Sequence, residues 1–302
     1  MAFNRTQELK ELVPGLNAIF GFELKQYENE HTEIFDSETS DRAFEEEVLF
    51  TGFGAAPTKA EGASVMYDEA AEGWIARYNH ETVAMAFAIT EEAMEDNLYD
   101  KLAPRLTKML ARSMSHTKQV KAANVLNNGF STSYLGGDGE PLFDTAHPLS
   151  GGGTLANRPS TDADLSETSL EDACIAIEGW YDDRAIPQAI KVKKLIIPRQ
   201  LVYVAKRLLD SDGRVATPDN DLNALKSTNS VPGGYVVNHR LTDPDAWFLK
   251  TDAPDGMKFF TRVKMQTKME GDFETGNVRY KARERYTFGW SDWRGMYGTT
   301  GS

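Results

Sequence analysis

The sequence predicts an α+β protein, and three patterns carry this prediction. Apolar residues recur at spacings of three and four over residues 90–128, which indicates a long helix. Apolar and polar residues alternate over Thr261–Met269 and Val278–Trp290, which indicates two long strands. Between these elements lies a middle section in which shorter helical and strand patterns are mixed.

Length and charge limit the classes of protein to consider. The 302 residues carry 46 acids against 33 basic residues, a net charge of −13, and 40% of them are hydrophobic. These values suit a globular protein with a substantial core. No run of about 18 apolar residues occurs, so no membrane-spanning helix is expected. The acidic balance argues against a general nucleic-acid binder. The single cysteine, Cys174, excludes an intrachain disulfide and a cysteine-rich metal site.

The first 50 residues concentrate the negative charge. They hold twelve acids and four basic residues, and they therefore carry −8 of the total charge. Apolar residues near the start indicate a helix that is broken by Pro14-Gly15. The acidic remainder fits either a solvated surface segment or an arm that lies against the basic face of another subunit.

Residues 45–90 predict an oversized hairpin. An outgoing strand over residues 46–53 leads to a tip at residues 54–63, and a return strand runs from Trp74 to Ile89. The alternation changes phase around His80-Glu81-Thr82, which indicates a bulge or a change of environment there. Such a hairpin has little of its own to bury, so its stability has to come from the rest of the chain or from a neighbouring copy.

The long helix is predicted over residues 90–128. Thr90 suits its N-cap, and the acids at positions 91 and 92 suit its first turn. An apolar stripe is expected to face the core, and it consists of Met94, Leu98, Leu102, Leu106, Met109 and Leu110. Pro104 lies inside this pattern and predicts a kink or a break near Ala103.

The middle section predicts a domain of about 120 residues. Thr168-Ser169-Leu170-Glu171 has the form of a capping box and predicts a helix with Cys174 on its apolar face. Short strands are predicted at residues 195–197, 235–237 and 247–249. Helices and strands alternate loosely, so this section fits either an α+β or an α/β domain.

The two strands near the C-terminus carry the strongest local pattern. Turn residues between them indicate a hairpin with one apolar and one basic face. The predicted basic face consists of Arg262, Lys264, Lys268, Arg279, Lys281, Arg283 and Arg285. It is either a solvated surface, a track for DNA phosphates or an acceptor for acidic segments of neighbouring subunits. Unpaired like charges across strands cost stability, which favours a partner.

The sequence indicates no catalytic, cofactor or metal site. Asp144, His147 and Ser150 lie within seven residues, but the nucleophile elbow that accompanies the catalytic serine of many hydrolases is missing. The five histidines include no pair at metal-binding spacing, and no phosphate-binding glycine loop occurs. Cys174 is expected to be an inert core thiol.

Several stretches resemble one family in their order along the chain. They are Phe143-Asp144-Thr145-Ala146-His147-Pro148 with the glycines that follow, Leu195-Ile196-Ile197-Pro198, and residues 243–249 and 284–294. Together with the acidic arm, the long hairpin and the long helix, these stretches resemble the major capsid proteins of tailed phages. Their specific residues resemble the Mu-like prophage major head subunit family.

The resemblance implies the tailed-phage major capsid fold, with four parts. These are an N-terminal arm (1–45), an extended β-hairpin loop (46–82), a peripheral domain with a long spine helix (83–130 and 262–290) and an axial domain (131–261 and 291–302). The hairpin would reach over a neighbouring subunit, and the arm would cross to another subunit's periphery.

The implied function is that of a major head protein. It would self-assemble as hexamers and pentamers into an icosahedral shell around double-stranded DNA, so that it is made in the host cytoplasm and located in the virion. Expected partners are further copies of the chain, a separate scaffold and a portal, and a decoration protein is a further candidate. The packaged DNA would be contacted weakly and without sequence specificity, and no cofactor or membrane is expected.

Candidate contacts between subunits follow from these expectations. They are Glu28, Glu30, Glu33, Glu45, Glu46, Lys59, Trp74 and the seven cations of the predicted basic face. Some relatives crosslink a loop lysine to an asparagine of a neighbour, but no acid or asparagine partner can be matched to Lys59, so no crosslink is expected. Two other classes stay open: another β-rich virion subunit, such as a tail-tube or decoration protein, and a soluble hydrolase built around His147 and Ser150.

Overall fold

The structure is a computed structural model that describes residues 5–27, 29–90, 92, 99–213, 222–272 and 276–302. Its helices and 3₁₀ turns are α1 (Arg5–Gln26), η1 (Glu30–Glu33), α3 (Tyr99–Asn127), α4 (Glu167–Glu178), η2 (Arg199–Leu201), α5 (Val202–Asp210), α6 (Ala224–Ser227) and η3 (Trp293–Gly295). Its strands are β1 (Asp36–Thr39), β2 (Phe44–Phe50), β3 (Glu72–Asn79), β4 (Glu81–Ile89), β5 (His147–Pro148), β6 (Thr154–Leu155), β7 (Val192–Ile197), β8 (Tyr235–Val237), β9 (Trp247–Thr251), β10 (Met257–Gly271), β11 (Val278–Trp290) and β12 (Met296–Thr299). The mixture of elements confirms the α+β prediction.

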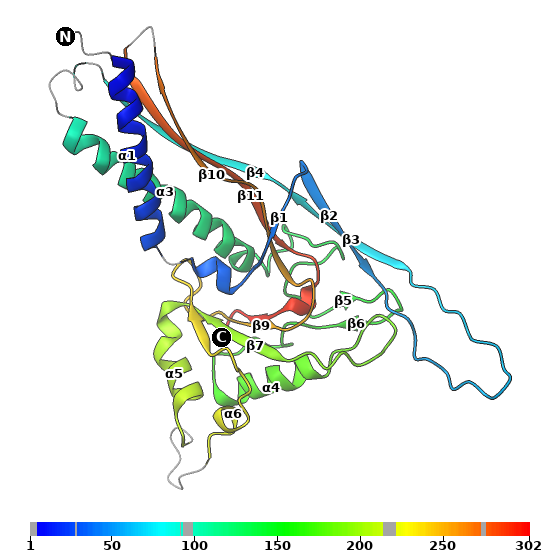
Figure 1. Cartoon of the computed structure of the whole chain (residues 1–302). Coiled ribbons are helices and arrows are strands. Elements are labelled where there is room, and N and C mark those ends of the chain that lie inside the picture. Colours follow the sequence, from blue (N-terminus) through cyan, green and yellow to red (C-terminus); the bar gives the residue numbers. More distant parts are fainter. Residues whose placement is uncertain (1–4, 28, 91, 93–98, 214–221, 273–275) are drawn as a thin grey trace.

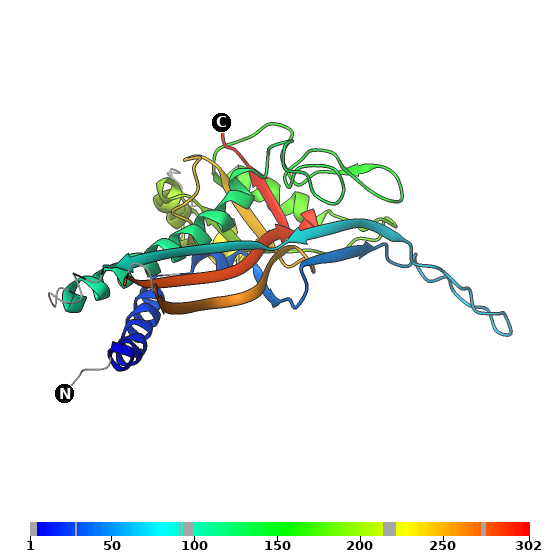
Figure 2. The ribbon, with the colours of Figure 1, turned by 90° about the horizontal axis from the view of Figure 1, so that it is seen from above.

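A long sheet with the strand order β1-β10-β11-β4 forms one part of the molecule. β10 and β11 pair antiparallel from Met257 opposite Trp290 to Gly271 opposite Val278, as the alternation predicts. Helices α1 and α3 lie on the apolar face of this sheet (Figures 1 and 2). The core between them includes Phe20 of α1, Met114 of α3 and Tyr280 of β11, all of which are buried.

A second sheet with the order β12-β9-β7-β8 forms the other part, and α4 and α5 pack against it. Its core contains Trp180, Trp247 and Trp293 together with the apolar faces of both helices. A further cluster of buried residues, which includes Phe143, Phe248 and Phe259, joins the two sheets. The chain crosses between the sheets directly from β9 to β10, and this cluster draws its buried residues from strands of both sheets.

The hairpin leaves the body at the junction of β3 and β4. β2 and β3 form a two-stranded sheet, and residues 51–71 extend beyond the body (Figures 1 and 2). His80 alone separates β3, which pairs with β2, from β4, which pairs with β11. The change of environment predicted around His80 is thus confirmed, because the return strand passes from one sheet into another.

The predicted helix break at Pro14-Gly15 is wrong, and of the kink or break predicted near Ala103 the break is wrong. α1 continues through Pro14, and α3 continues through Pro104. A proline inside a helix costs about 3 kcal/mol through a lost hydrogen bond and a steric clash. After Pro14, Leu16 and Phe20 are buried against α3 and the sheet, and each contributes about 1.5–3 kcal/mol. Tertiary packing therefore outweighs the local preference.

The predicted start of α4 is also wrong. The N-cap is Ser166 rather than Thr168, and the Ser166 hydroxyl accepts a hydrogen bond from the backbone N–H of Ser169. The Ser169 hydroxyl occupies the place of the expected acid and completes a capping box with the Ser166 backbone N–H. The N-cap therefore lies two residues before Thr168, the position predicted from the Thr168-Ser169-Leu170-Glu171 pattern.

The apolar stripe of α3 does not face the core along its length. Leu110 is buried, but Leu102 and Met109 are 42% and 61% exposed. The α3 residues in the core against the sheet are the small Ala103 and Ala111 together with Leu110 and Met114. Small residues bring the helix close to the strands, which leaves Leu102 and Met109 on the outer surface. Met94 and Leu98 of the predicted stripe, and the predicted first turn at residue 91, lie outside the described residues.

Candidate assembly surfaces

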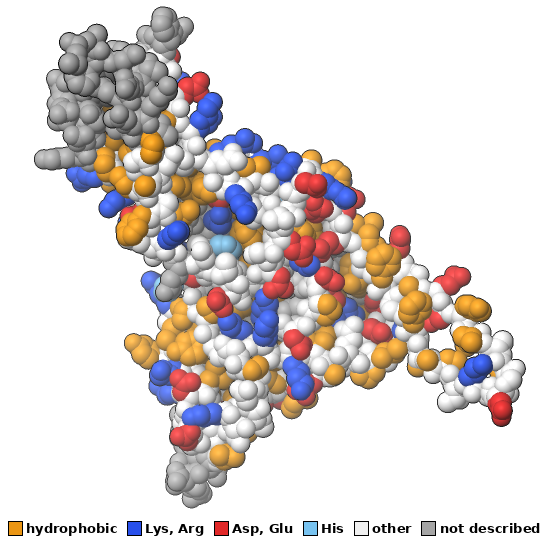
Figure 3. Space-filling view, viewed as in Figure 1, with side chains coloured by type: hydrophobic (Ala, Val, Ile, Leu, Met, Phe, Trp, Pro, Cys, Tyr) orange, Lys and Arg blue, Asp and Glu red, His pale blue; other side chains and the backbone are white. Residues whose placement is uncertain are grey.

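The basic face of the long sheet lies opposite α1 and α3. Lys268 stands directly across from Lys281, and Arg283 is opposite Gln266. On the other side of β11, the small residues Ala86 and Ala84 are the register partners of Lys281 and Arg283. Of the seven predicted cations, Lys264, Lys268, Arg279, Lys281 and Arg283 are exposed, whereas Arg262 and Arg285 are half-buried. Figure 3 shows blue side chains gathered along the upper edge of the body.

Part of this positive charge has no counterpart among the described residues. Lys268 lies 3.2 Å from Glu270, and Arg279 lies 2.5 Å from Asp272. Lys281 and Arg283 form no ion pair within the described residues. A hollow of about 340 Å³ opens here, and its lining combines Lys268, Arg279 and Lys281 with Ala86, Glu270, Gly271 and Asp272. Two like charges opposite one another, next to a small-residue floor, make a surface that suits an anionic partner.

The hairpin is acidic and exposes apolar side chains. Residues 44–79 hold seven acids against two basic residues, and Lys59 is exposed near the tip. The large exposed apolar residues of this segment are Phe44, Phe50, Phe53, Val65, Met66, Tyr67 and Ile75. Residues 51–71 thus leave apolar side chains in water far from the body (Figure 3).

The predicted contact residues at the base of the hairpin have partners within the chain. Glu46 lies 3.7 Å from Arg77 on the facing strand, and Glu45 accepts a hydrogen bond of 2.6 Å from the Ser40 hydroxyl. Trp74 packs partly buried against the core of the second sheet.

The acidic segment after α1 forms ion pairs with distant residues of its own chain. The buried Glu30 pairs with Arg240 and lies 2.9 Å from the His239 ring, and Glu33 pairs with Lys194. The prediction of a solvated segment is therefore wrong at Glu30. Glu28 lies outside the described residues. The partners of Glu30 and Glu33 are more than 160 residues away, which is why no local pattern reveals them.

Ion pairs also link the acidic residues of β1 to other strands of the chain. Asp36 lies 3.0 Å from Lys250, and Glu38 lies 2.5 Å from Lys258. Lys258 also contacts Glu47 and Asp255. Burial alone would lower the pKa of Lys258, but the hydrogen bonds from its ammonium to Glu38 and Asp255 raise it. This ammonium therefore stays charged and ties β1, β2 and β10 together.

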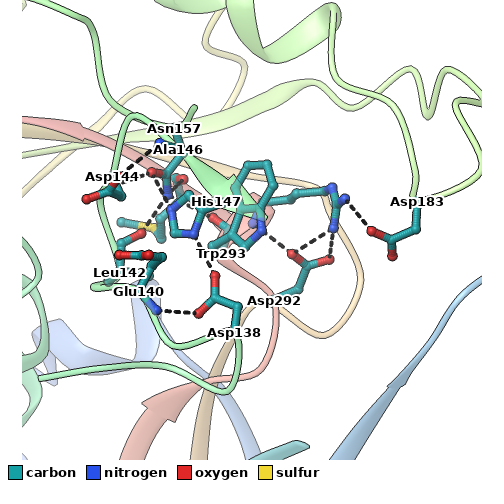
Figure 4. A network of polar contacts seen from close by, with 12 residues as sticks. Asp138, Glu140, Leu142, Asp144, Ala146, His147, Asn157, Asp183, Asp292 and Trp293 are labelled. Atoms are coloured by element: carbon teal, nitrogen blue, oxygen red, sulfur yellow. Dashed lines mark hydrogen bonds and ion pairs between the residues drawn. The ribbon is translucent and has the colours of Figure 1, made fainter. Parts of the chain in front are cut away.

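His147, the central residue of the hydrolase alternative, forms its side-chain hydrogen bonds with residues other than Asp144 and Ser150. His147 is fully buried, with its Nδ1 2.6 Å from Asp138 and its Nε2 3.0 Å from the Asn157 side-chain oxygen. Its ring stacks on Trp293 at a centroid distance of 4.5 Å (Figure 4). The Asp144 carboxylate accepts a hydrogen bond from the Ala146 N–H, which shapes the loop. Because both ring nitrogens are engaged, His147 has no nitrogen free to act as a base.

Asn157 organises this network. Its amide nitrogen donates to the carbonyl oxygens of Leu142, Trp293 and Met296, at 2.7, 3.2 and 3.1 Å. Its side-chain oxygen is therefore the acceptor for His147 Nε2–H. The network joins the loop around residue 147 to the C-terminal segment (Figure 4), which is a structural role.

Neither a metal cluster nor a reactive thiol emerges from the described residues. Within them, no group of three or more His, Cys, Asp or Glu side chains is placed to hold a metal ion. Cys174 is partly buried on α4, and burial raises the pKa of its thiol to about 11. In the part of the chain that the structure describes, no helix is long and apolar enough to cross a membrane.

Comparison with known proteins gives the family. Residues 75–299 match the sequence profile of a family described as phage capsid protein. The chain belongs to this phage capsid protein family. No curated protein sequence matches it.

Three solved structures show the same fold. The procapsid of bacteriophage JBD30 has a TM-score of 0.56 and 14% identity, over 99% of this chain and 77% of that chain. The virus-like particle from Pyrococcus furiosus has a TM-score of 0.52 and 10% identity, over 94% and 97%. Mycobacterium phage Adephagia has a TM-score of 0.51 and 13% identity, over 91% of both chains. The tailed-phage major capsid fold predicted from the sequence is thus confirmed, and the protein is a major capsid protein of the phage shell. The narrower Mu-like assignment stays a prediction.

Proposed function

We propose that this capsid protein builds an icosahedral shell of hexamers and pentamers around double-stranded DNA, as a head subunit of the Mu-like type. In this proposal residues 1–45 are the arm, 46–82 the extended loop, 83–130 and 262–290 the peripheral domain, and 131–261 and 291–302 the axial domain. A separate scaffold, a portal and a decoration protein would be partners, and synthesis would take place in the host cytoplasm. The chain would act structurally and not as an enzyme.

One observation carries the proposal, namely a projecting hairpin whose tip leaves large apolar side chains exposed, although its base is tied to the body by Arg184, which donates to the Glu69 carbonyl oxygen at 2.9 Å and lies 3.8 Å from Asp68. Phe53, Met66 and Tyr67 are 61%, 72% and 92% exposed, and a hairpin of two strands is marginal by itself in water. Burying such side chains at about 25 cal/mol per Å² favours contact with a second molecule. In a closed shell every copy supplies one hairpin and receives one, so the same modest contact is repeated throughout.

The receiving surface is proposed to be the basic face of a neighbouring copy. Within the described residues Glu61, Glu69 and Glu72 of the hairpin form no ion pair, and neither do Lys281 and Arg283, so these charges are complementary. Glu46, Glu47 and Asp68 of the hairpin are less suited to this contact, as are Glu30 and Glu33, because they already pair within the chain. A net charge of −13 opposes tight adsorption of the packaged DNA on the subunit as a whole.

The test begins with the hairpin itself. Replacing residues 55–67 by a short Gly-Ser linker keeps the backbone hydrogen bond of 2.9 Å between Thr51 and Ala71. The variant should keep the circular dichroism spectrum of the natural chain, and negative-stain microscopy should show neither shells nor hexamers. Normal shells from this variant would refute the assignment of the hairpin as an assembly loop.

Charge reversal tests the receiving face. We expect Lys281→Glu with Arg283→Glu to abolish assembly, and assembly of the natural chain to weaken as salt rises. The matched control is Lys193→Glu with Lys206→Glu, which changes the net charge equally at exposed lysines elsewhere. If both double variants assemble alike, the basic face is not the receiving surface.

A further inference from the structure

The outer surface of α3 carries apolar residues that nothing in the described chain covers. Leu102, Leu106 and Met109 follow one another at spacings of four and three. Leu102 and Met109 are exposed, and Leu106 is half-buried, whereas the neighbouring Thr107 and Leu110 are buried toward the sheet. The polar residues Ser113 and His116 follow at the same spacing, so the apolar stripe ends at Met109 after two turns of the helix.

Two arginines flank this outer stripe (Leu102, Leu106 and Met109). Arg105 and Arg112 are exposed and lie seven residues apart, so they stand on the same side of the helix two turns from each other. Within the described residues neither forms an ion pair, while the nearby Lys108 lies 4.0 Å from Glu23 of α1. The face thus combines an apolar centre with a positive edge on a protein that is acidic overall.

We propose that the outer stripe of α3 is the docking face for an acidic amphipathic helix of a separate assembly protein. This inference rests on the proposed capsid function and adds the place and chemistry of one partner. An apolar face in a partner helix would cover Leu102 and Met109, and acids beside it would meet Arg105 and Arg112.

Charge and polarity exclude the other occupants. DNA would neutralise the two arginines but would leave Leu102 and Met109 in water, because a phosphate backbone offers them no apolar surface. A second copy docked through the same stripe would bring arginines against arginines, which costs stability. An acidic amphipathic helix can both cover the apolar side chains and pair with the two arginines.

The experiment uses the full-length, unassembled chain and labelled synthetic peptides. The probe is a 21-residue helix with Leu at the a and d positions of its heptads and Glu at the flanking e and g positions. A second peptide has Lys in place of Glu, and fluorescence anisotropy measures the binding of each. We expect the acidic peptide to bind at least about tenfold more tightly than the basic one.

Three variants decide the outcome. Arg105→Glu with Arg112→Glu should reverse the preference to the basic peptide, which simple unfolding cannot do. Leu102→Gln with Met109→Gln should weaken binding of the acidic peptide about tenfold or more. The control Ile175→Gln changes a side chain that is 71% exposed on α4 and should leave binding unchanged.

Several results would overturn the inference. They are equal binding of the two peptides, no reversal in the arginine variant, displacement of the acidic peptide by duplex DNA at equal concentration, or loss of self-association in the Leu102 and Met109 variant without peptide. Shell formation by each variant is recorded separately by microscopy. A chain that forms shells but binds no peptide refutes the docking face alone, and a chain that binds peptide but never forms shells refutes the capsid proposal.

Discussion

Replacing Lys118 tests how helix α3 is held to the long sheet. Glu284 occupies a position on β11 between the buried residues Ala282 and Tyr286, so its carboxylate points toward α3 and is itself buried. The Lys118 ammonium lies 2.5 Å from one carboxylate oxygen, and the other oxygen has no hydrogen-bond partner among the described residues. Burial raises the pKa of Glu284, and Lys118 opposes that rise.

The size of the effect follows from this geometry. Lys118→Met leaves a buried charge without a partner, and such a change costs about 3–5 kcal/mol at pH 7. Combining Lys118→Met with Glu284→Met removes both charges at similar volume, and we expect a stability within about 1 kcal/mol of the natural chain. Urea unfolding of the unassembled chain, followed by tryptophan fluorescence, measures both values at an unchanged m-value.

The pH dependence supplies an internal control. Without Lys118 the pKa of Glu284 rises further in the folded state above its unfolded value, so the folded state binds more protons. The stability of Lys118→Met therefore falls as pH rises through that interval, and its deficit should shrink when the pH is lowered to 5. A double variant as unstable as the single one would refute the reasoning. The cost would then come from lost packing of Lys118 over the Tyr286 ring, 5.3 Å away.

Four further predictions concern single sites. Burial lowers the pKa of His31 to about 4, so the unfolded chain binds more protons between pH 4 and 6.5. Stability should therefore fall by up to about 3 kcal/mol as pH drops through that window, and His31→Phe should flatten the dependence in urea titrations. Asn157→Asp should destabilise by about 3 kcal/mol or more, because three carbonyl oxygens lose their donor; an unchanged unfolding midpoint would contradict this. Cys174 should react with a thiol reagent at pH 8 far more slowly than the same residue in urea, and equal rates would contradict its burial. Mass spectrometry of digested shells should find Lys59 unmodified, and a branched peptide at Lys59 would reveal a crosslink.

Long periodic elements could be predicted from the sequence, because their signal lies within a few residues. The alternation of Val278–Trp290 places Arg279, Lys281 and Arg283 on the exposed face, as the structure has them. The phase change at His80 likewise marks the passage between two sheets.

Other features could not be predicted, because they depend on residues far apart in the chain. Glu30 is acidic and locally unremarkable, yet it is buried by Arg240 and His239. Glu284 interrupts the apolar face of β11, and only the position of α3 supplies its partner Lys118. In α3 the periodicity gives the helix but not its rotation, since the small Ala103 and Ala111 face the sheet while the larger Leu102 and Met109 do not.

The single residue between β3 and β4 has a mechanical consequence. A pull on the hairpin along its length passes through His80 into β4, which is paired with β11 along all nine of its residues. Because the force runs parallel to the strands, the ladder is loaded in shear, and its hydrogen bonds have to fail together rather than one after another. A shell whose neighbours hold one another by such hairpins would carry tension from subunit to subunit along its stiffest direction.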